Sequence, residues 1–366
     1  MDASLGKTSH KPLSILFALS LFVSGCAFQQ QEVVSTAADT SKIQQPLTVS
    51  TPVTQLSDEK IQLALKNAYT KFKNDQSGKN ADYIKALAEV DSKLYGISVV
   101  TTDGRIFEIG DVKSKFSIQS ISKVFTLAGI MQQTSPAIVQ EKIGVNATGL
   151  AFNSMIAVET IPERTVNPFV NAGAIASTSL IEATDSAQRW DLIKANMDNF
   201  AGRELDLNEQ VYQSEVNDNL SNQALSKRLE SYGRIYSDPL EATTVYTRQC
   251  SVNVTSHDLA VMGSVLANHG VNPITGKRII DADNTPYILA VMATAGLYDN
   301  AGGWLYETGT PAKSGVGGGI LAIVPGKLSI GVFSPPLDGY GNSVRGQLAA
   351  AYIINELKLN PYDAGH

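Results

Sequence analysis

Residues 313–333 read KSGVGGGILAIVPGKLSIGVF, and this stretch decides the fold. It contains two apolar runs, 319–324 and 328–333, which are joined at Pro325-Gly326. Apolar runs of this length on either side of a Pro-Gly turn are typical of two buried strands that pair as a hairpin. We therefore expect a β-hairpin near the C-terminus, entered from a glycine-rich segment.

A second hairpin is predicted near the other end of the chain. Residues 96–101 are rich in β-branched side chains, Asp103-Gly104 is a strong turn signal, and residues 105–109 alternate enough to form the returning strand. A helix is expected before this hairpin, because Ser57 is a suitable N-cap and apolar side chains recur at helical spacing over 61–72.

Helical patterns dominate the chain between the two hairpins. A helix is expected over 116–131, and a final helix closes the chain at 344–357. The helical stretches between them are 171–182, 190–201, 219–231, 257–269 and 286–295. Since strands from both ends bracket a helical region, we predict an α+β fold. It has one antiparallel sheet built from N- and C-terminal strands, flanked by helices, with a helical subdomain.

The bulk composition narrows the range of functions. Hydrophobic residues make up 43% and charged residues 17% of the 366 residues, which allows a large buried core. The formal net charge is −6 and the main body has no concentrated Lys/Arg block, which argues against nucleic acid as a partner. The four histidines and two cysteines lack the spacings of metal ligands, so we expect no metal and no other cofactor.

The N-terminus has the pattern of a secretory signal. Lys7 and Lys11 precede an apolar run, 13–23, that is too short for a comfortable transmembrane helix. Val23-Ser24-Gly25-Cys26 resembles the lipobox of bacterial lipoproteins, in which the cysteine is lipidated. The alternatives are an ordinary signal peptide cut nearby or a chance cysteine.

Three parts of the chain follow from this reading. We expect a lipoprotein signal peptide at 1–25, a lipidated Cys26 with a flexible tether at 26–56, and a catalytic domain at 57–366. The protein would then be exported and held at a membrane, facing the periplasm, through its N-terminal lipid alone.

The segment Ser120-Ile121-Ser122-Lys123 places a hydroxyl and an amine three residues apart, on one face of a helix. An alcohol is a poor nucleophile until a base takes its proton, and a lysine can be that base if it is stored uncharged. Burial and a nearby cation such as Lys313 would both favour the neutral amine. The alternative is an N-cap serine followed by a solvated lysine. The apolar residues around the pair, such as Phe116 and Phe125, argue for a buried helix instead.

The segment Lys313-Ser314-Gly315 offers a second amine and hydroxyl, followed by glycines at 317, 318 and 319. Glycines weaken a strand unless something must approach the backbone, and an acyl substrate needs that proximity to reach N–H donors. The alternative is a flexible loop before a core strand; a phosphate-binding GxxxxGK[ST] loop does not match. Together the two segments are the parts of a serine acyl-transfer enzyme that uses a lysine base. Ser251-Val252-Asn253 could imitate a third motif, but its flanks look like an ordinary strand or helix edge.

Six longer segments resemble the glutaminase family, whose members share the serine β-lactamase and penicillin-binding fold. The resemblance covers about residues 60–355, the whole folded part. The segments are GKNADYI at 78–84, QSISK at 119–123, NPFVNAGAI at 167–175, QSE at 213–215, PAKSGV at 311–316 and SPPLD at 334–338.

The resemblance implies hydrolysis of L-glutamine to L-glutamate and ammonia. Ser120 would form a γ-glutamyl ester, Lys123 would take its proton, and the N–H groups of Ser120 and Val316 would form the oxyanion hole. Tyr298 resembles a tyrosine that shuttles protons near the nucleophile. The substrate-binding set that the resemblance implies is Tyr83, Gln119, Asn171, Glu215, Asn222, Tyr246 and Val316. A carboxylate such as Glu215 suits the substrate ammonium, whereas each asparagine could instead be a helix cap and each tyrosine a core residue.

Two other functions are compatible with the motifs. A periplasmic β-lactamase or D,D-peptidase shares the Ser-x-x-Lys and Lys-Ser-Gly logic, and a non-catalytic lipoprotein would keep the fold as a binding module. The second of these predicts the loss of key groups, and none is missing. By analogy with relatives we expect a homodimer or homotetramer. The lipobox departs from the family, because its bacterial members usually look cytosolic.

Overall fold

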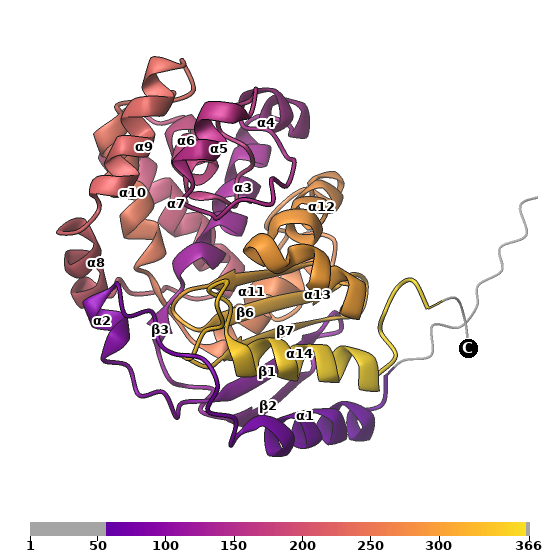
Figure 1. The fold of residues 1–366 in the computed structure, drawn as a ribbon. Helices are drawn as coiled ribbons and strands as arrows, with labels where there is room; N and C mark the ends of the chain where they lie inside the picture. The colour runs from indigo at the N-terminus through magenta and orange to yellow at the C-terminus, as the bar shows by residue number, and fades with distance from the viewer. Residues whose placement is uncertain (1–55, 364–366) are drawn as a thin grey trace, which may run out of the picture. The chain divides into compact units, whose positions relative to one another are not determined.

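The computed structural model describes residues 56–363, so the predictions for the signal peptide, Cys26 and almost all of the tether lie outside the described residues. Five strands form an antiparallel sheet in the order β2-β1-β7-β6-β5 (Figure 1). The strands are β1 (Gly96–Thr101), β2 (Ile106–Gly110), β5 (Ala312–Gly315), β6 (Gly319–Val324) and β7 (Leu328–Phe333). Both predicted hairpins are confirmed, and they join where β1 pairs with β7 from Gly96↔Phe333 to Thr101↔Leu328.

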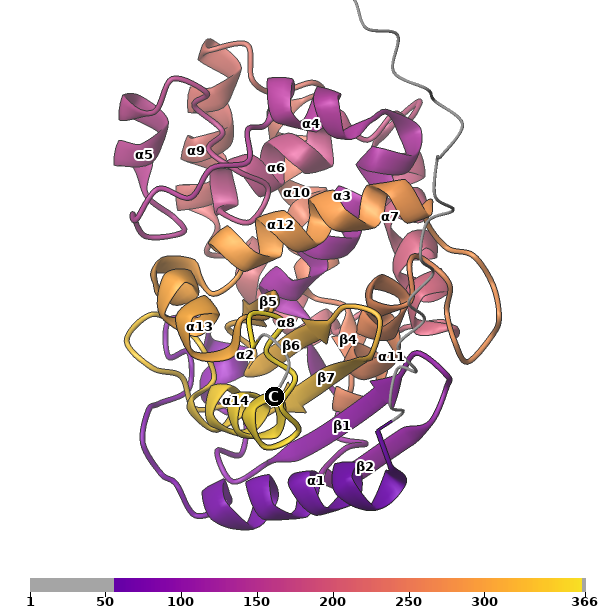
Figure 2. The same cartoon turned by 90° about the vertical axis from the view of Figure 1, so that its right-hand side faces the viewer.

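Helices cover both faces of the sheet (Figure 1; Figure 2). On one face lie α1 (Asp58–Phe72) and α14 (Val344–Glu356), which pack on each other and on the sheet. Helix α1 begins after Ser57, whose side chain accepts a hydrogen bond from the Lys60 N–H, as expected. On the other face lies α11 (Ser256–Ala267), against β1, β6 and β7. It comes so close that a Cβ on Gly331 of β7 would lie 2.3 Å from the Ser256 carbonyl oxygen.

The remaining helices include those of the predicted helical subdomain. They are α2 (Lys85–Ala88), α3 (Ser122–Gln133), α4 (Pro136–Lys142), α5 (Met155–Thr160), α6 (Asn171–Leu180), α7 (Ser186–Ala201), α8 (Glu209–Val216), α9 (Leu220–Ser231), α10 (Pro239–Cys250), α12 (Thr285–Ala295) and α13 (Ala301–Thr308). The five helical stretches expected between the hairpins are confirmed, with ends that shift by a few residues. The α+β prediction is confirmed as well.

The helix expected over 116–131 is wrong in its first third. Phe116–Ser117 is a short strand, β3, that pairs with β4 (Asn253–Val254), and a 3-10 turn follows at Gln119–Ile121 before α3 begins. Gln119 has a left-handed backbone, φ 50°, which a continuing α-helix cannot contain. The apolar pattern of this segment comes from burial on all sides and does not distinguish strand from helix.

Two apolar cores surround this arrangement. One lies between the sheet and the helices α1 and α14, and the other joins α3, α6, α7 and α11 to the opposite face of the sheet. The segment between β3 and α3 lies where the sheet meets the helical part, against β5 and β6. Among residues 56–363 no helix is long and apolar enough to cross a membrane.

Candidate active site

Ser120 lies in the 3-10 turn just before α3, with its side chain at the wall of a cavity of about 470 Å³. The residue is 6% exposed. Gln119, immediately before it, has the left-handed backbone described above. Residues other than glycine adopt this conformation at a cost of about 1–3 kcal/mol. Strain of this kind persists only where the surroundings hold it, and it aims the serine at the cavity.

Lys123 lies in the first turn of α3 and is 1% exposed. Its amine donates to the Asn171 side-chain oxygen at 2.9 Å and to the Phe169 carbonyl at 3.2 Å. Burial lowers the pKa of Lys123 to about 8, so a usable fraction of the amine is neutral near neutral pH. Within residues 56–363 no hydrogen bond joins this amine to the Ser120 hydroxyl. Catalytic hydrogen bonds are often long or poorly aligned before substrate binds and shorten in the complex with substrate.

Lys313 is a second buried lysine, on β5 at the edge of the sheet. Its amine donates to the Ser314 carbonyl at 2.7 Å and lies 4.3 Å from the centre of the Tyr298 ring. Burial lowers the pKa of Lys313 well below its usual value, and the charge of Lys123 lowers it further. The sequence predicted that burial and Lys313 would both lower the pKa of Lys123; burial has this effect, and the two buried amines repel each other when both are charged.

Tyr298 stands beside the nucleophile on a left-handed turn, φ 54°. Its hydroxyl donates to the Ser314 carbonyl at 3.5 Å and lies near enough to the Ser120 side chain to be influenced by it. The Phe152 ring packs on it with centroids 4.6 Å apart. Burial raises the pKa of Tyr298, and the nearby Ser120 side chain opposes this rise. A neutral phenol beside the nucleophile can accept and pass on a proton.

The glycines after Lys313 are explained by the protein's own backbone. A Cβ on Gly315 would lie 2.7 Å from the Ile118 carbonyl oxygen, and one on Gly317 would lie 2.5 Å from that of Ser117. The sequence predicted close approach of a substrate here. That approach stays a prediction; the structure adds that these two glycines let β5 and the turn after it lie directly against the segment that carries Ser120. Val316, between them, lines the cavity beside Ser120.

A network of polar side chains forms another wall of the cavity. The Asn171 side-chain oxygen accepts hydrogen bonds from Lys123 and from the Tyr246 hydroxyl at 3.0 Å. Its amide nitrogen donates to the Asn222 oxygen at 3.1 Å. Asn171 therefore links the proposed base to residues from α9 and α10.

Glu215 at the end of α8 is half-buried and accepts a hydrogen bond from the Gln119 amide at 2.6 Å. Burial raises the pKa of Glu215 to about 7, although the bond from Gln119 favours the ionised form. In the described part of the chain, no ion pair joins it to Lys or Arg. A carboxylate in a cavity with no cationic side chain bound to it is suited to a cationic ligand group.

The structure brings the predicted residues of 56–363 together. Lining the cavity are Tyr83, Gln119, Ser120, Asn171, Glu215, Asn222, Tyr246 and Val316. Lys123 and Tyr298 do not line the cavity themselves. Lys123 is hydrogen-bonded to the lining residue Asn171, and Tyr298 lies beside the lining residue Ser120. The segment Ser251-Val252-Asn253, which could have imitated a third motif, does not line the cavity. The Asn253 amide donates to the Asp206 side chain instead.

Several lining residues were missed by the sequence analysis. They include Phe152, Asn153, Ser214, Asp218, Ser221 and Cys250. Phe152 and Asn153 lie in an irregular connection, and Cys250 ends a helix that was not predicted, so no periodic pattern marked them. No group of three or more His, Cys, Asp or Glu side chains placed to hold a metal is found among residues 56–363.

Comparisons with known proteins agree on one family. The family model described as Glutaminase matches residues 78–362. A glutaminase of Colwellia psychrerythraea is 56% identical over 300 residues, which cover 82% of this chain and 96% of that protein. A glutaminase of Mycobacterium marinum is 48% identical over 310 residues, covering 85% and 97% of the two chains.

Solved structures show the same relationship. A probable glutaminase, YbaS, superposes with a TM-score of 0.83 at 48% identity, over 84% of this chain and 100% of that chain. A probable glutaminase from Bacillus subtilis, complexed with 6-diazo-5-oxo-L-norleucine, gives a TM-score of 0.76 at 28% identity, over 84% and 99% of the two chains.

Proposed function

The chain belongs to the glutaminase family, has its β-lactamase-like fold and hydrolyses L-glutamine to L-glutamate, and from this premise we propose that Ser120 is the nucleophile and Lys123 its general base. The observation that carries the proposal is the position of Ser120. It lines a polar cavity beside Tyr298, while the buried amine of Lys123 lies one turn further along the chain.

Acylation begins when the Ser120 oxygen bonds to the side-chain carbonyl carbon of glutamine and Lys123 accepts the hydroxyl proton. The N–H groups of Ser120 and Val316 bind the oxygen that becomes negative, an interaction worth about 3–4 kcal/mol for one donor in related chemistry. The carbon–nitrogen bond then breaks. Tyr298 relays the proton from Lys123 to the leaving nitrogen, which departs as ammonia.

Deacylation reverses the proton path. Water adds to the carbonyl carbon of the γ-glutamyl ester and gives a proton to the same relay. The bond to the Ser120 oxygen breaks, the serine recovers its proton, and L-glutamate leaves. Water is the only co-reactant, so the atoms balance without a redox step.

The substrate is held by groups that suit its two charged ends. We assign the ammonium to Glu215, whose burial without a cation leaves room for one. The carboxylate is assigned to neutral donors of the cavity wall, which pair with it without introducing a permanent charge. These donors are Tyr83, Gln119, Asn171, Asn222 and Tyr246.

The covalent step is tested by trapping the intermediate. Acid quenching during turnover, followed by peptide mass spectrometry, is expected to find one γ-glutamyl group on the peptide that contains Ser120. 6-Diazo-5-oxo-L-norleucine, an electrophilic analogue present in the Bacillus subtilis complex, is expected to label the same peptide. Ser120→Ala is the control. Full activity in this variant, or label on another residue, would show that the nucleophile is wrong.

For the N-terminal part we propose export with lipidation at Cys26, after removal of residues 1–25 and with residues 26–56 as the tether to a catalytic domain at 57–366. The support is the sequence pattern around Cys26. Expression in a bacterial host with a radioactive fatty acid is expected to label the wild type and not Cys26→Ser. Equal labelling of both refutes the lipobox.

We further propose a homodimer or homotetramer, by analogy with relatives alone. The mass of the chain without residues 1–25, measured by sedimentation equilibrium over a range of concentrations, tests it. A monomer throughout that range contradicts the proposal.

A further inference from the structure

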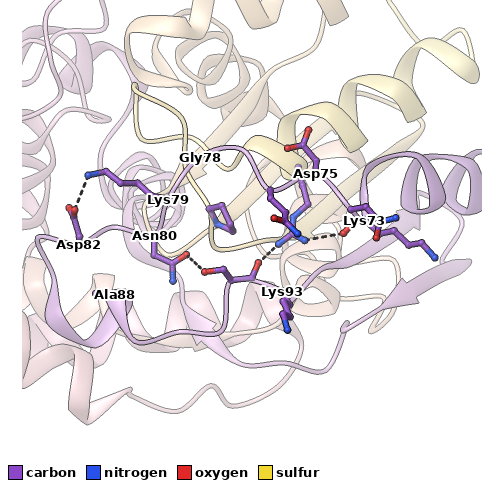
Figure 3. A pocket seen from close by; sticks show the side chains of 13 residues that line it. Lys73, Asp75, Gly78, Lys79, Asn80, Asp82, Ala88 and Lys93 are labelled. Carbon is purple, nitrogen blue, oxygen red and sulfur yellow. Dashed lines mark hydrogen bonds and ion pairs between the residues drawn. The ribbon is translucent and has the colours of Figure 1, made fainter.

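The segment that carries Tyr83 to the active site is a long excursion, which we call the 73–94 loop because it runs from the end of α1 to the start of β1. It contains only the one-turn helix α2. A hollow of about 840 Å³ lies beside it, lined by residues such as Gly78, Asn80 and Ala88 (Figure 3). Main-chain pairing of Lys79 with Leu337 and burial of Ala81 and Leu87 hold the middle of the loop on its other side, so the open side leaves the two ends to be held by side-chain contacts.

Arg345 holds both ends of this loop. It lies in the first turn of α14 and is 3% exposed. Its guanidinium donates to the Lys73 carbonyl at 3.4 Å at one end of the loop, and to the Ser92 carbonyl and the Leu94 carbonyl at the other, the latter at 3.1 Å. The remaining bond goes to the Ser334 hydroxyl at 2.8 Å.

The side chain of Asn80 connects Ser92, which Arg345 contacts, to the part of the loop near Tyr83. The Ser92 hydroxyl donates to the Asn80 side-chain oxygen at 3.1 Å, as the dashed line in Figure 3 shows. The Asn80 amide in turn donates to the Val90 carbonyl at 2.7 Å. Arg345, Ser92 and Asn80 thus form a continuous chain that ends three residues before Tyr83.

Arg345 differs from Arg203, whose side chain is exposed and pairs with a buried carboxylate. Arg203 makes a bidentate ion pair with Asp258, at 2.7 and 2.6 Å. No carboxylate makes an ion pair with Arg345 in the described part of the chain, and burial lowers its pKa although Asp75 and Asp111 act against this at longer range. Burying a cation that has no ion-pair partner is unfavourable. The planar guanidinium of arginine offsets this cost because it donates hydrogen bonds to several oxygens at once.

We infer that Arg345 is a positioning residue for glutamine binding, because it clamps the two ends of the 73–94 loop and so fixes Tyr83 at the cavity. The inference rests on the proposed role of Tyr83 in holding the substrate. Arg345 does not line that cavity, so it acts only through the loop.

The test compares Arg345→Met and Asn80→Ala with the control Arg203→Met. We expect both clamp variants to raise KM for glutamine about five- to tenfold, the equivalent of one ordinary hydrogen bond, with kcat nearly unchanged. Hydrogen exchange over residues 73–94 is expected to rise in both. Arg345→Lys, which keeps three donors, recovers part of the affinity. Arg203→Met lowers the melting temperature and leaves KM alone.

Tyr83→Ala separates the possible failures. It is expected to raise KM, and combining it with Arg345→Met adds little, because both act through one contact. If Tyr83→Ala raises KM while Arg345→Met and Asn80→Ala lower only the melting temperature, the clamp is refuted. If Tyr83→Ala leaves KM unchanged, the role of Tyr83 fails and the inference fails with it. Should Arg345→Met not fold, Arg345→Lys and Asn80→Ala decide the question.

Discussion

Lowering the pH from 8 to 6 is expected to weaken glutamine binding through Glu215. Its pKa in the free enzyme is about 7, and only the ionised carboxylate pairs with the substrate ammonium. The apparent dissociation constant then scales as 1 + 10^(pKa − pH), which is about 1.1 at pH 8 and about 11 at pH 6. We therefore expect affinity to fall about tenfold across this range.

The measurement separates binding from chemistry. Titration calorimetry with Ser120→Ala, which binds glutamine without turning it over, gives the dissociation constant at each pH. At pH 6 binding is expected to release about 0.9 proton, and at pH 8 about 0.1, which buffers of different ionisation enthalpy reveal. Glu215→Gln on the same background is the control, and we expect weak binding that does not change over this pH range. A dissociation constant that stays constant from pH 6 to 8 in Ser120→Ala would refute the pairing.

Stability of the free enzyme provides an independent check with a defined sign. The pKa of Glu215 lies above its ordinary value of 4.5, so the folded chain binds more protons than the unfolded chain between pH 4.5 and about 7. This group's contribution to stability therefore falls as the pH rises through that window. Glutamine, by supplying a cation, is expected to raise the melting temperature more at pH 8 than at pH 6.

Three further perturbations test the catalytic groups. Lys123→Arg keeps the charge but cannot act as a base, so it is expected to lower kcat about 10²–10⁴-fold. The kcat of the wild type is expected to rise as the pH passes through about 8, the pKa of Lys123, and a kcat independent of pH contradicts the assignment. Tyr298→Phe is expected to lower kcat with little change in KM, and equal kcat values would remove the relay. Gly317→Ala forces a Cβ to 2.5 Å from the Ser117 carbonyl oxygen, so both kcat and melting temperature are expected to fall; an unchanged kcat would separate this glycine from the oxyanion hole.

Local pattern was sufficient for most of the fold. The hairpins and the helices α1, α6, α7, α9, α11, α12 and α14 each have a period or a turn signal of their own. Strand β5 does not, because Ala312–Gly315 has no β-branched residue and becomes a strand only by pairing with β6. Helix α10 was missed even though Asp238 caps it and Pro239 begins it. Its β-branched content and burial obscured the helical period.

The candidate site was predictable where chemistry requires neighbours in sequence. Ser120 and Lys123 are three residues apart, so their proximity follows from any helical turn. The link from Lys123 to Asn171 spans 48 residues, and the link from Gln119 to Glu215 spans 96. Only the tertiary fold creates such contacts, and for these residues the resemblance to a family, not local pattern, provided the prediction.

The glycine run connects the fold to the chemistry. The oxyanion hole proposed for this chain requires backbone N–H groups from two segments, those of Ser120 and Val316, to point at one oxygen. Side chains at 315 and 317 would hold β5 away from the segment that carries Ser120, because their Cβ atoms would meet the carbonyls of Ile118 and Ser117. Glycine at both positions lets the edge of a rigid sheet lie against the nucleophile's turn. Val316 is thereby brought beside Ser120, in an arrangement that neither segment could produce alone.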